Sequence, residues 1–243
     1  MKVTSVETLR ANCLLPTAAG LFVGTSEAHL FTLRGEALEP LCPFDKVQGR
    51  QDWYTPWGDP PEVRSISADP SGTVYVNVHV GGVVRSTDGG RSWKPTIDVH
   101  ADVHQVLFDP GSGRVLAASA RGLAVSNDGG ASWQFDTKGR HGNYLRAVAV
   151  AGGTVLVTAS TGPSTSHAAV YRRPLDGGEP FEQCRRGLPE WFSDNINTLC
   201  LTALDSWVAF GTSEGVVFLS ADEGQSWVVA AEGLPPVRCV ALR

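Results

Sequence analysis

Three stretches of the chain repeat one eight-residue pattern, Ser-x-Asp-x-Gly-x-Ser-Trp, and this repeat constrains the fold more than any other feature. The three copies span 86–93, 126–133 and 220–227. A short apolar run, typical of a strand, precedes each copy, at 82–85, 123–125 and 216–219. A pattern with five fixed positions does not recur three times by chance, so the chain is built from repeated units of the same local structure.

The chemistry of the pattern predicts a β-hairpin. Asp accepts hydrogen bonds from backbone amides two residues on, and Gly adopts positive φ, so the Asp-x-Gly step forms a turn. The Ser and the Trp begin the returning strand, and the indole covers the apolar side of the hairpin. We therefore interpret these residues as structural rather than catalytic: Asp88, Trp93, Asp128, Trp133, Asp222 and Trp227.

The pattern resembles the Asp-box, also called the BNR repeat, of β-propellers such as sialidases, sortilin-type receptors and photosystem-assembly factors, within the wider WD40/YVTN-like superfamily. The resemblance is specific for the hairpin and for the propeller class. In that family the boxes are structural and lie on the rim of the face away from the ligand site. The resemblance therefore implies a functional site at the opposite face.

The spacing of the copies predicts five repeats. The last gap is about twice the first, and a degenerate copy between them keeps Asp176-Gly-Gly, with Phe181 in the Trp position. A weaker copy lies near 31–35, and the preceding stretch 21–27 closely matches 208–214. Five repeats of roughly 40 to 50 residues have the length of four-stranded propeller blades.

One repeat shows the predicted blade most clearly. Its strands are expected at 63–67, at 73–78 and up to Arg85, and the fourth strand is expected to start at Trp93. Short strands with turn signals at this spacing are typical of an all-β protein.

The two ends of the chain bear on the blade count. Residues 237–242 align with the predicted first strands at 103–107 and 197–201, and residues 2–6 also have a strand pattern. We expect the two terminal strands to pair and close the ring, because closure removes exposed edges. The expected fold is all-β, a single closed propeller domain over 1–243 with five four-stranded antiparallel blades. A six-bladed ring with one blade shared between the termini is the alternative.

Composition is that of a globular chain with enough apolar material for a core, at 42% hydrophobic and 19% charged residues. The net charge of -5 argues against a nucleic-acid partner. No apolar run has transmembrane length and the start has no signal-peptide core, so we expect no membrane partner and a cytoplasmic location. Five cysteines without a Cys-x-x-Cys pair favour free thiols, with Cys200 and Cys239 in inner strands. No phosphate loop, nucleophile elbow or zinc signature is present, and no cofactor is predicted.

In a propeller, the loops from the fourth strand of one blade to the first strand of the next share a face with the second-to-third turns. The irregular sequence of this chain gathers in those loops. The first of them, 45–62, holds Trp53, Tyr54 and Trp57 within five residues. Exposed aromatics with a polar rim predict contact with a sugar, a peptide or a protein. The alternative is that these rings pack the loop onto the blades.

The second loop, 98–104, alternates acidic and imidazole side chains with Val and Ala. If it is extended, its carboxylates and imidazoles point to one side. His100 and His104 are then weak candidates for metal ligands, or part of an acid–base pair. The alternative is a polar strand that enters a hydrated channel.

Arg64, Arg146 and Arg238 occupy related positions at the start of predicted first strands, where their guanidinium groups could converge on a carboxylate or phosphate. The alternative is that each Arg pairs with a nearby acid or stacks on an aromatic ring. All six histidines also map to this face. The other residues assigned to ligand binding there are His104, His141, Tyr144, Trp191 and Asn197.

The leading functional hypothesis is a non-catalytic propeller module that binds a protein, or a small anionic or carbohydrate ligand, at the face opposite the Ser-x-Asp turns. The alternative is a glycoside hydrolase, sialidase-like or metal-assisted, with its site at the same mouth. The Arg-Ile-Pro element of sialidases is missing, and sequence does not pair the carboxylates that glycoside hydrolysis needs. A propeller fold by itself does not decide between these functions.

Overall fold

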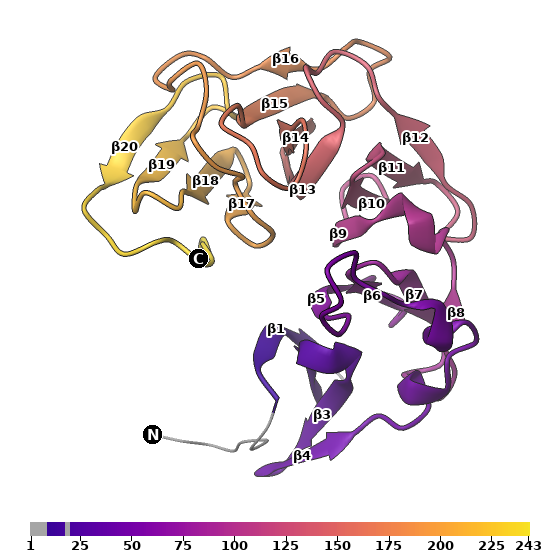
Figure 1. Ribbon diagram of the computed structural model, residues 1–243. Coiled ribbons are helices and arrows are strands. Elements are labelled where there is room, and N and C mark those ends of the chain that lie inside the picture. The colour runs from indigo at the N-terminus through magenta and orange to yellow at the C-terminus, as the bar shows by residue number, and fades with distance from the viewer. Residues whose placement is uncertain (1–8, 18–19) are drawn as a thin grey trace. The chain divides into compact units, whose positions relative to one another are not determined.

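The computed structural model describes residues 9–17 and 20–243, which form an all-β structure of five four-stranded antiparallel sheets (Figure 1). Each sheet is a meander, because its four strands are consecutive in the sequence and pair in that order. The five sheets correspond to the five predicted repeats, and the strands predicted between 63 and 85 are present.

The strand bounds are as follows. The first sheet contains β1 (Ala11–Thr17), β2 (Gly20–Thr25), β3 (Leu30–Arg34) and β4 (Ala37–Pro40). The second contains β5 (Val63–Ala68), β6 (Val74–Val78), β7 (Gly82–Ser86) and β8 (Lys94–Pro95). The third contains β9 (Val103–Asp109), β10 (Arg114–Ser119), β11 (Gly122–Ser126) and β12 (Gln134–Asp136). The fourth contains β13 (Tyr144–Ala151), β14 (Thr154–Ser160), β15 (Ala169–Pro174) and β16 (Glu182–Gln183). The fifth contains β17 (Leu201–Leu204), β18 (Trp207–Gly211), β19 (Val217–Ser220) and β20 (Val228–Ala231).

The helices of the described residues are short 3-10 turns: η1 (Ser26–Ala28), η2 (Phe44–Lys46), η3 (Arg50–Asp52) and η4 (Val99–Ala101). None of these turns is long and apolar enough to cross a membrane.

The chain divides into two compact units. The first comprises the described residues up to Val115 together with Ser126–Trp133, and the second comprises Leu116–Val125 and Gln134–Arg243. The first unit carries the first two sheets and β9, and the second carries the last two sheets with β12 and most of β11.

The second strand of a sheet is buried on both faces. Every residue of β6 and of β14 is buried, whereas residues of β5 alternate between buried and half-buried. A strand buried on both faces needs apolar cover on each side, so one such sheet is not stable alone. Outer strands such as β8 and β16 have only two residues, which limits the exposed edge available for pairing with other chains.

In the first unit, neighbouring sheets are joined by a side-chain donor that reaches the carbonyl at the start of the next first strand. Asn12 Nδ2 donates to the Val63 carbonyl at 3.2 Å, and Asn77 Nδ2 donates to the Val103 carbonyl at 2.7 Å. A buried carbonyl without a donor is costly, so these bonds fix where the next sheet begins.

Two buried serines of β5 hold β9 beside it. The Val106 amide donates to Ser65 Oγ and the Phe108 amide donates to Ser67 Oγ, each at 2.8 Å. The first strands β5 and β9 therefore lie side by side although each belongs to its own sheet. This neighbourhood of first strands is the arrangement of successive propeller blades.

The second unit has two similar bonds, which reach carbonyls of segments outside the strands. Thr158 Oγ1 donates to the Ile196 carbonyl at 2.9 Å, and Cys200 Sγ lies 3.4 Å from the Val237 carbonyl. The donors differ in chemistry, but each meets the carbonyl of an aliphatic residue in the segment that follows its sheet.

The segment 237–242, predicted as a first strand, forms no strand in the structure. It is held instead by single hydrogen bonds, from the Val237 amide to the Thr212 carbonyl and from the Val240 amide to the Leu199 carbonyl. Without further ladder bonds among the described residues it stays irregular. Residues 2–6, its predicted partner strand, lie outside the described residues.

The strand predicted at 197–201 begins only at Leu201. The Asn197 carbonyl accepts the Cys200 amide at 3.0 Å, and Leu199 has a φ of 64°. A turn with left-handed backbone cannot continue a strand, so β17 starts four residues late. Cys200 therefore precedes the strand, and Cys239, expected in an inner strand, is exposed.

Two glycines allow the close approach at these junctions. A Cβ at Gly24 would lie 2.3 Å from Val63 Cγ1, and a Cβ at Gly211 would lie 2.3 Å from Val237 Cγ1. The glycines belong to the matching stretches noted in the sequence, and the match therefore reflects one junction used twice.

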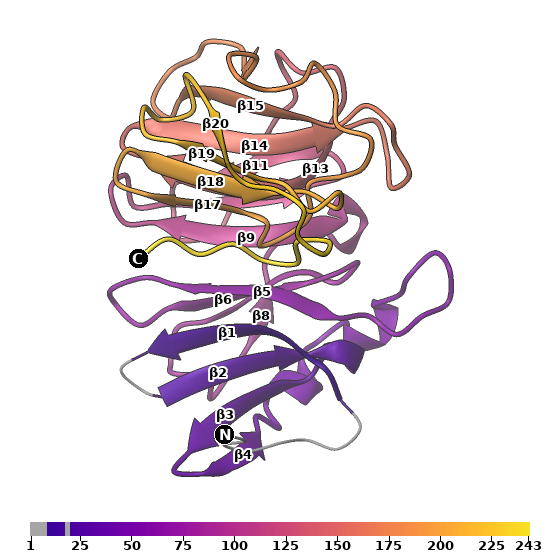
Figure 2. The same cartoon turned by 90° about the vertical axis from the view of Figure 1, so that its left-hand side faces the viewer.

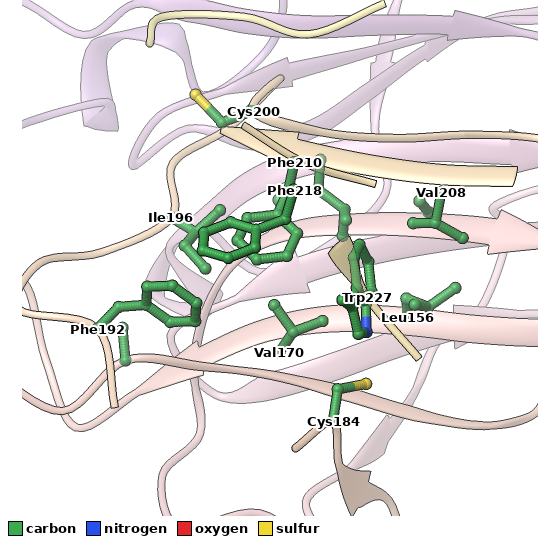
Figure 3. Packing of buried hydrophobic residues seen from close by; sticks show 14 of the residues in the cluster. Leu156, Val170, Cys184, Phe192, Ile196, Cys200, Val208, Phe210, Phe218 and Trp227 are labelled. Atoms are coloured by element: carbon green, nitrogen blue, oxygen red, sulfur yellow. The ribbon is translucent and has the colours of Figure 1, made fainter. Parts of the chain in front are cut away.

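The last two sheets enclose an apolar cluster in the second unit (Figure 3). Phe210 stacks on Phe218 with ring centroids 5.0 Å apart, and Trp227 meets Phe210 edge-on at 4.9 Å. Phe192, from the loop that precedes β17, meets Phe210 edge-on at 5.5 Å. The Trp of the third repeat copy is thus part of the core.

The Ser-x-Asp turns share one hydrogen-bond pattern. Asp88 Oδ1 accepts from Ser86 Oγ at 2.8 Å and from the amides of Arg91 and Ser92 at 3.0 and 2.9 Å. Asp88 Oδ2 accepts from Ser92 Oγ at 2.6 Å, and Ser86 Oγ accepts from the Gly90 amide at 2.9 Å. The amides that Asp88 binds are three and four residues on, rather than two as expected. The turn therefore closes through its own side chains.

The pattern recurs at Asp128 and Asp222, where Ser220 Oγ and Ser226 Oγ donate to Asp222 at 2.7 and 2.5 Å. Burial acts to raise the pKa of Asp222, but the hydrogen bonds from Ser226 and its neighbours outweigh it and lower that pKa to about 2. Hydrogen bonds led by the Ser92 hydroxyl lower the pKa of Asp88 to about 2 as well. The turns are built around ionised carboxylates.

The indole N–H groups of the tryptophans have two kinds of acceptor, one within the turn and one outside it. The indole N–H of Trp93 donates to the Gly90 carbonyl at 3.0 Å, whereas that of Trp133 donates to Thr96 Oγ1 at 3.4 Å. In the degenerate copy, Phe181 is buried directly before β16, at the place of the Trp, and Asp176 lies exposed in the β15–β16 turn.

Replacing Asp222 by Asn should make stability less dependent on pH. A carboxyl whose pKa is lowered on folding stabilises the fold above its unfolded pKa of about 3.9, and this contribution is lost as pH falls toward about 2. We expect Asp222→Asn to lower the Tm at pH 7 by roughly 2–4 °C, with the difference shrinking below pH 4. Thermal melts across this pH range measure it. Asp205→Asn, at an exposed position, is the control. An equal change of Tm in both variants would contradict a stabilising role of the Asp222 carboxylate in its turn.

Replacing Gly211 by Ala should displace the C-terminal segment. The added methyl would overlap Val237 Cγ1, and overpacking of this kind costs about 1–3 kcal/mol. Denaturant unfolding measures the loss, and limited proteolysis should cleave the 237–242 segment faster. Gly153→Ala is the matched control, because a Cβ at Gly153 meets no atom within 4 Å. Equal stability of the two variants would refute the close approach.

Candidate functional site

Three side chains with metal-binding and acid–base chemistry meet inside the first unit. Asp102 Oδ1 lies 3.4 Å from His79 Nε2 and 3.5 Å from His104 Nε2, and the two imidazole rings are 5.6 Å apart. The His79 and His104 side chains are 1% and 0% exposed, and that of Asp102 is 27% exposed. Their ligand atoms all lie within 4.8 Å of one another.

Local structure brings Asp102 to this place. The Asp98 carboxylate accepts the His100 amide at 2.8 Å and caps η4, and the Asp102 amide then donates to the Val99 carbonyl. Asp102 leaves the turn with a left-handed φ of 49°, which an Asp tolerates better than most residues. The chain enters β9 at the next residue, which places His104 on the first strand.

His79 comes from the second sheet, directly after β6. Asn77 lies two residues earlier on the same face of that strand and donates to the Val103 carbonyl, beside His104. Two polar residues stand here in a run of buried valines, Val74–Val80. The site thus rests on two rigid strands, β6 and β9.

A pocket of about 400 Å³ opens over this cluster, with His79 in its wall. Trp57, which is 54% exposed, lines the pocket with its ring 5.6 Å from the His79 ring. Glu62 pairs in the pocket with Arg10 and, at 3.5 Å, with Arg64. The other lining residues are Ser26, Glu27, Thr55, Asp59 and Pro60.

The pocket lies at the end of the sheets opposite the Ser-x-Asp turns. In the antiparallel second sheet, the β4–β5 loop and the β6–β7 turn leave one end, and the β5–β6 and β7–β8 turns leave the other. Figure 2 shows the long loop before β5 and the β5–β6 turn on opposite sides of this sheet. In the first unit, the pocket therefore lies at the end of the sheets where the sequence predicts the functional site.

A larger hollow, of about 710 Å³, lies at the turn end of the same sheets. Apolar side chains such as Phe108 and the turns at 69–72 and 87–89 line it. Its two carboxylates, Asp69 and Asp88, accept hydrogen bonds within their own turns. We place the candidate site at the smaller pocket, because His79 of the cluster and the exposed Trp57 line it.

The three aromatic residues of the 45–62 loop have different environments. Trp53 is buried, with its ring 5.9 Å from that of Phe44 and the Arg50 guanidinium 4.8 Å above it. It therefore packs the loop, as the alternative interpretation held, and is no exposed anchor. Tyr54 and Trp57 are exposed, and of these Trp57 lines the pocket.

The condition on which His100 and His104 were paired, an extended segment, is not met. Segment 98–104 is not extended, because the Asp98 cap bends it into η4. The exposed His100 lies beside Tyr54, with ring centroids 6.4 Å apart, and outside the cluster. His79 takes its place, and neither His79 nor Asp102 was assigned to a site from the sequence. The signal available was a polar pair, Asn77 and His79, within a valine strand.

The second unit gathers a separate aromatic group. His141 Nδ1 lies 2.7 Å from Tyr171 Oη, and His141 Nε2 lies 2.8 Å from the His167 carbonyl. The Trp191 ring meets the His141 ring edge-on at 4.6 Å and the His167 ring at 5.5 Å. Burial raises the pKa of Tyr171. Two of the predicted binding residues, His141 and Trp191, are thus brought together here.

The remaining predicted residues do not form one group within a unit. Tyr144 is buried, and the Arg146 guanidinium lies 5.1 Å above its ring. Asn197 and Arg238 are exposed. Arg64, which pairs with Glu62, belongs to the first unit and the other two arginines to the second. Their convergence on an anion stays a prediction.

No protein-family model matches the chain, and no curated protein matches it. Solved structures do match. A GH74 xyloglucanase from Xanthomonas campestris has a TM-score of 0.62 at 16% identity over 91% of this chain and 38% of its own. YCF48 bound to D1 peptide has a TM-score of 0.60 at 16% identity over 93% and 70%. PorZ of Porphyromonas gingivalis has a TM-score of 0.62 at 13% identity over 94% and 29%.

These proteins are β-propellers, and the likeness supports a propeller fold for the chain. The chain spans only 24% to 38% of the GH74 enzymes that it matches. The neighbours include enzymes and non-enzymes, so they leave the function open.

Replacing Asn77 by Ala should lower the free energy of unfolding, because it removes the bond that ties β6 to β9 at the site. The variant leaves the Val103 carbonyl without its side-chain donor, and an unsatisfied buried polar group costs about 1–3 kcal/mol. Denaturant unfolding measures the change. The exposed Asn143→Ala is the control, and an unchanged free energy of unfolding in Asn77→Ala would contradict the importance of this bond.

Proposed function

We propose that the chain is a non-catalytic binding module, with its site in the pocket of Trp57 and His79 and a polypeptide segment as its ligand. The observation that carries the proposal is the exposed indole of Trp57 at a pocket lined by both signs of charge. An exposed aromatic beside a concave polar site is a typical anchor for a protein or peptide partner.

The charges of the pocket favour a basic side chain over an anionic ligand. Both arginines of the pocket, Arg10 and Arg64, pair with the same Glu62, and the two positive side chains of the lining stand against three carboxylates, a net charge of -1. Among the described residues, Glu27 and Asp59 line the pocket without an ion-pair partner. A Lys or Arg of the ligand would find two carboxylates and the face of Trp57, which attracts cations.

Fold likeness is compatible with this function. YCF48, solved with a peptide, is similar to 93% of this chain, which supports a peptide as the ligand class. The finer architecture belongs to the same proposal: one closed five-bladed propeller domain in the cytoplasm, with its Ser-x-Asp turns acting as Asp-boxes at the rim away from the ligand.

Hydrolysis of a glycoside is less well supported. It needs one carboxyl group that can donate a proton and a second carboxylate across the cleft. Asp59 and Glu62 both line the pocket, but Glu62 is engaged in ion pairs with Arg10 and Arg64. Turnover of xyloglucan or a sialoside by the full chain, lost in Glu62→Gln, would instead establish catalysis.

Peptides selected on the full chain from a random display library should contain a basic residue and depend on Trp57. We expect Trp57→Ala to weaken binding of a selected synthetic peptide by roughly 30-fold, as loss of a central aromatic anchor does. Titration calorimetry measures the affinity.

Trp207→Ala is the matched control, since Trp207 is an exposed tryptophan of the second unit. Selected peptides that bind both variants equally, or that bind as well after their basic residue is changed to Ala, would overturn the proposal.

A further inference from the structure

We infer that His79, Asp102 and His104 form a zinc site beneath the pocket, with one coordination position left for a ligand. The inference concerns the buried cluster itself and stands apart from the peptide-binding proposal. Two imidazoles and a carboxylate are a ligand set that zinc accepts in proteins, and sites with three protein ligands keep an open position.

The separations of the atoms match the spacing of zinc ligands. Ligands about 2.0–2.1 Å from a tetrahedral ion are about 3.3–3.4 Å apart. The distances from Asp102 Oδ1 to His79 Nε2 and His104 Nε2 are 3.4 and 3.5 Å. An octahedral ion with bonds of about 2.1 Å would bring neighbouring ligands to about 3.0 Å. The two separations that involve Asp102 therefore fit a tetrahedral ion.

The same distances are long for charge-assisted hydrogen bonds. A charged imidazole that donates to a carboxylate is usually about 2.7–2.9 Å from it. Both histidines instead stand farther off and share one oxygen, Asp102 Oδ1. An ion between the three groups would account for the convergence of both imidazoles on one carboxylate oxygen.

Burial adds to the argument. The imidazoles of His79 and His104 are almost fully removed from solvent, where polar groups are stable only with strong partners. A divalent ion bound by both rings would offset the Asp102 charge. All three ligand atoms lie within 4.8 Å of one another, a spread that small side-chain rotations can close.

The supporting structure has the rigidity that a metal site needs. His79 and His104 are carried by the adjoining ends of β6 and β9, which Asn77 ties together through the Val103 carbonyl. The η4 turn and its Asp98 cap fix the approach of Asp102. Such second-layer contacts orient metal ligands and raise affinity.

The pocket supplies a path for the ion and for a fourth ligand. His79 forms part of the pocket wall, and Asp102 is partly exposed. The open position would hold water, or a carboxylate or imidazole of a bound molecule.

Metal titration of the full chain tests the site. After removal of metal with a chelator, we expect one equivalent of Zn²⁺ to bind by calorimetry and to raise the Tm. Co²⁺ should bind with the intense visible absorption of a tetrahedral ion. Asp102→Asn and His79→Ala should each weaken Zn²⁺ binding by more than about 100-fold, beyond the loss typical of outer-layer changes.

His100→Ala is the matched control, because His100 lies nearby but outside the cluster, and it should bind Zn²⁺ as the unaltered chain does. Asp102→Asn keeps the shape of the side chain, and a melt in the absence of metal confirms that the variant is folded. The proposal is overturned if the unaltered chain binds no stoichiometric Zn²⁺, or if folded Asp102→Asn binds it with equal affinity. Loss of binding in His100→Ala, or an octahedral Co²⁺ spectrum, would also overturn it.

Discussion

The hydrogen bond from a side-chain donor at one sheet to a backbone carbonyl of the segment that follows that sheet is the interaction on which the rest of the structure depends. Asn12, Asn77, Thr158 and Cys200 are the donors in four such places. Because a second strand such as β6 is buried on both faces, its sheet needs a neighbour, and this bond sets the register of that neighbour. Apolar contact alone is non-directional and could not do so.

The candidate site follows from one of these junctions. Asn77 ties the start of β9 to the second sheet, and His79 and His104 follow the two bonded residues within two positions in the sequence. The contact between the second sheet and β9 therefore positions both histidines. The turn η4, capped by Asp98, positions Asp102 beside them. The two histidines are held by strand ends, while the loop with Trp57 supplies an exposed wall of the pocket.

Much of the fold was predictable because its signals are local. The Ser-x-Asp turns close through side chains within seven residues, so the pattern alone indicates the hairpin, and the strands around it follow. The failures came where a short-range bond overrides a strand pattern: the Asp98 cap bends 98–104, and the Asn197 turn delays β17. The site was less predictable, because His79 and His104 meet across 25 residues that no sequence pattern links. Trp53 and Trp57 look alike in the sequence, and only packing distinguishes them.

The glycine that admits the next segment so closely occurs in both the first and the last sheet, at Gly24 and Gly211. In each case the incoming residue is a valine whose carbonyl meets a donor from the preceding sheet. Such an architecture can grow by duplication. A copied repeat would meet the glycine and the side-chain donor of the sheet before it, and it would present the same two features to the sheet after it. A change in the number of repeats would therefore require no new kind of contact to evolve.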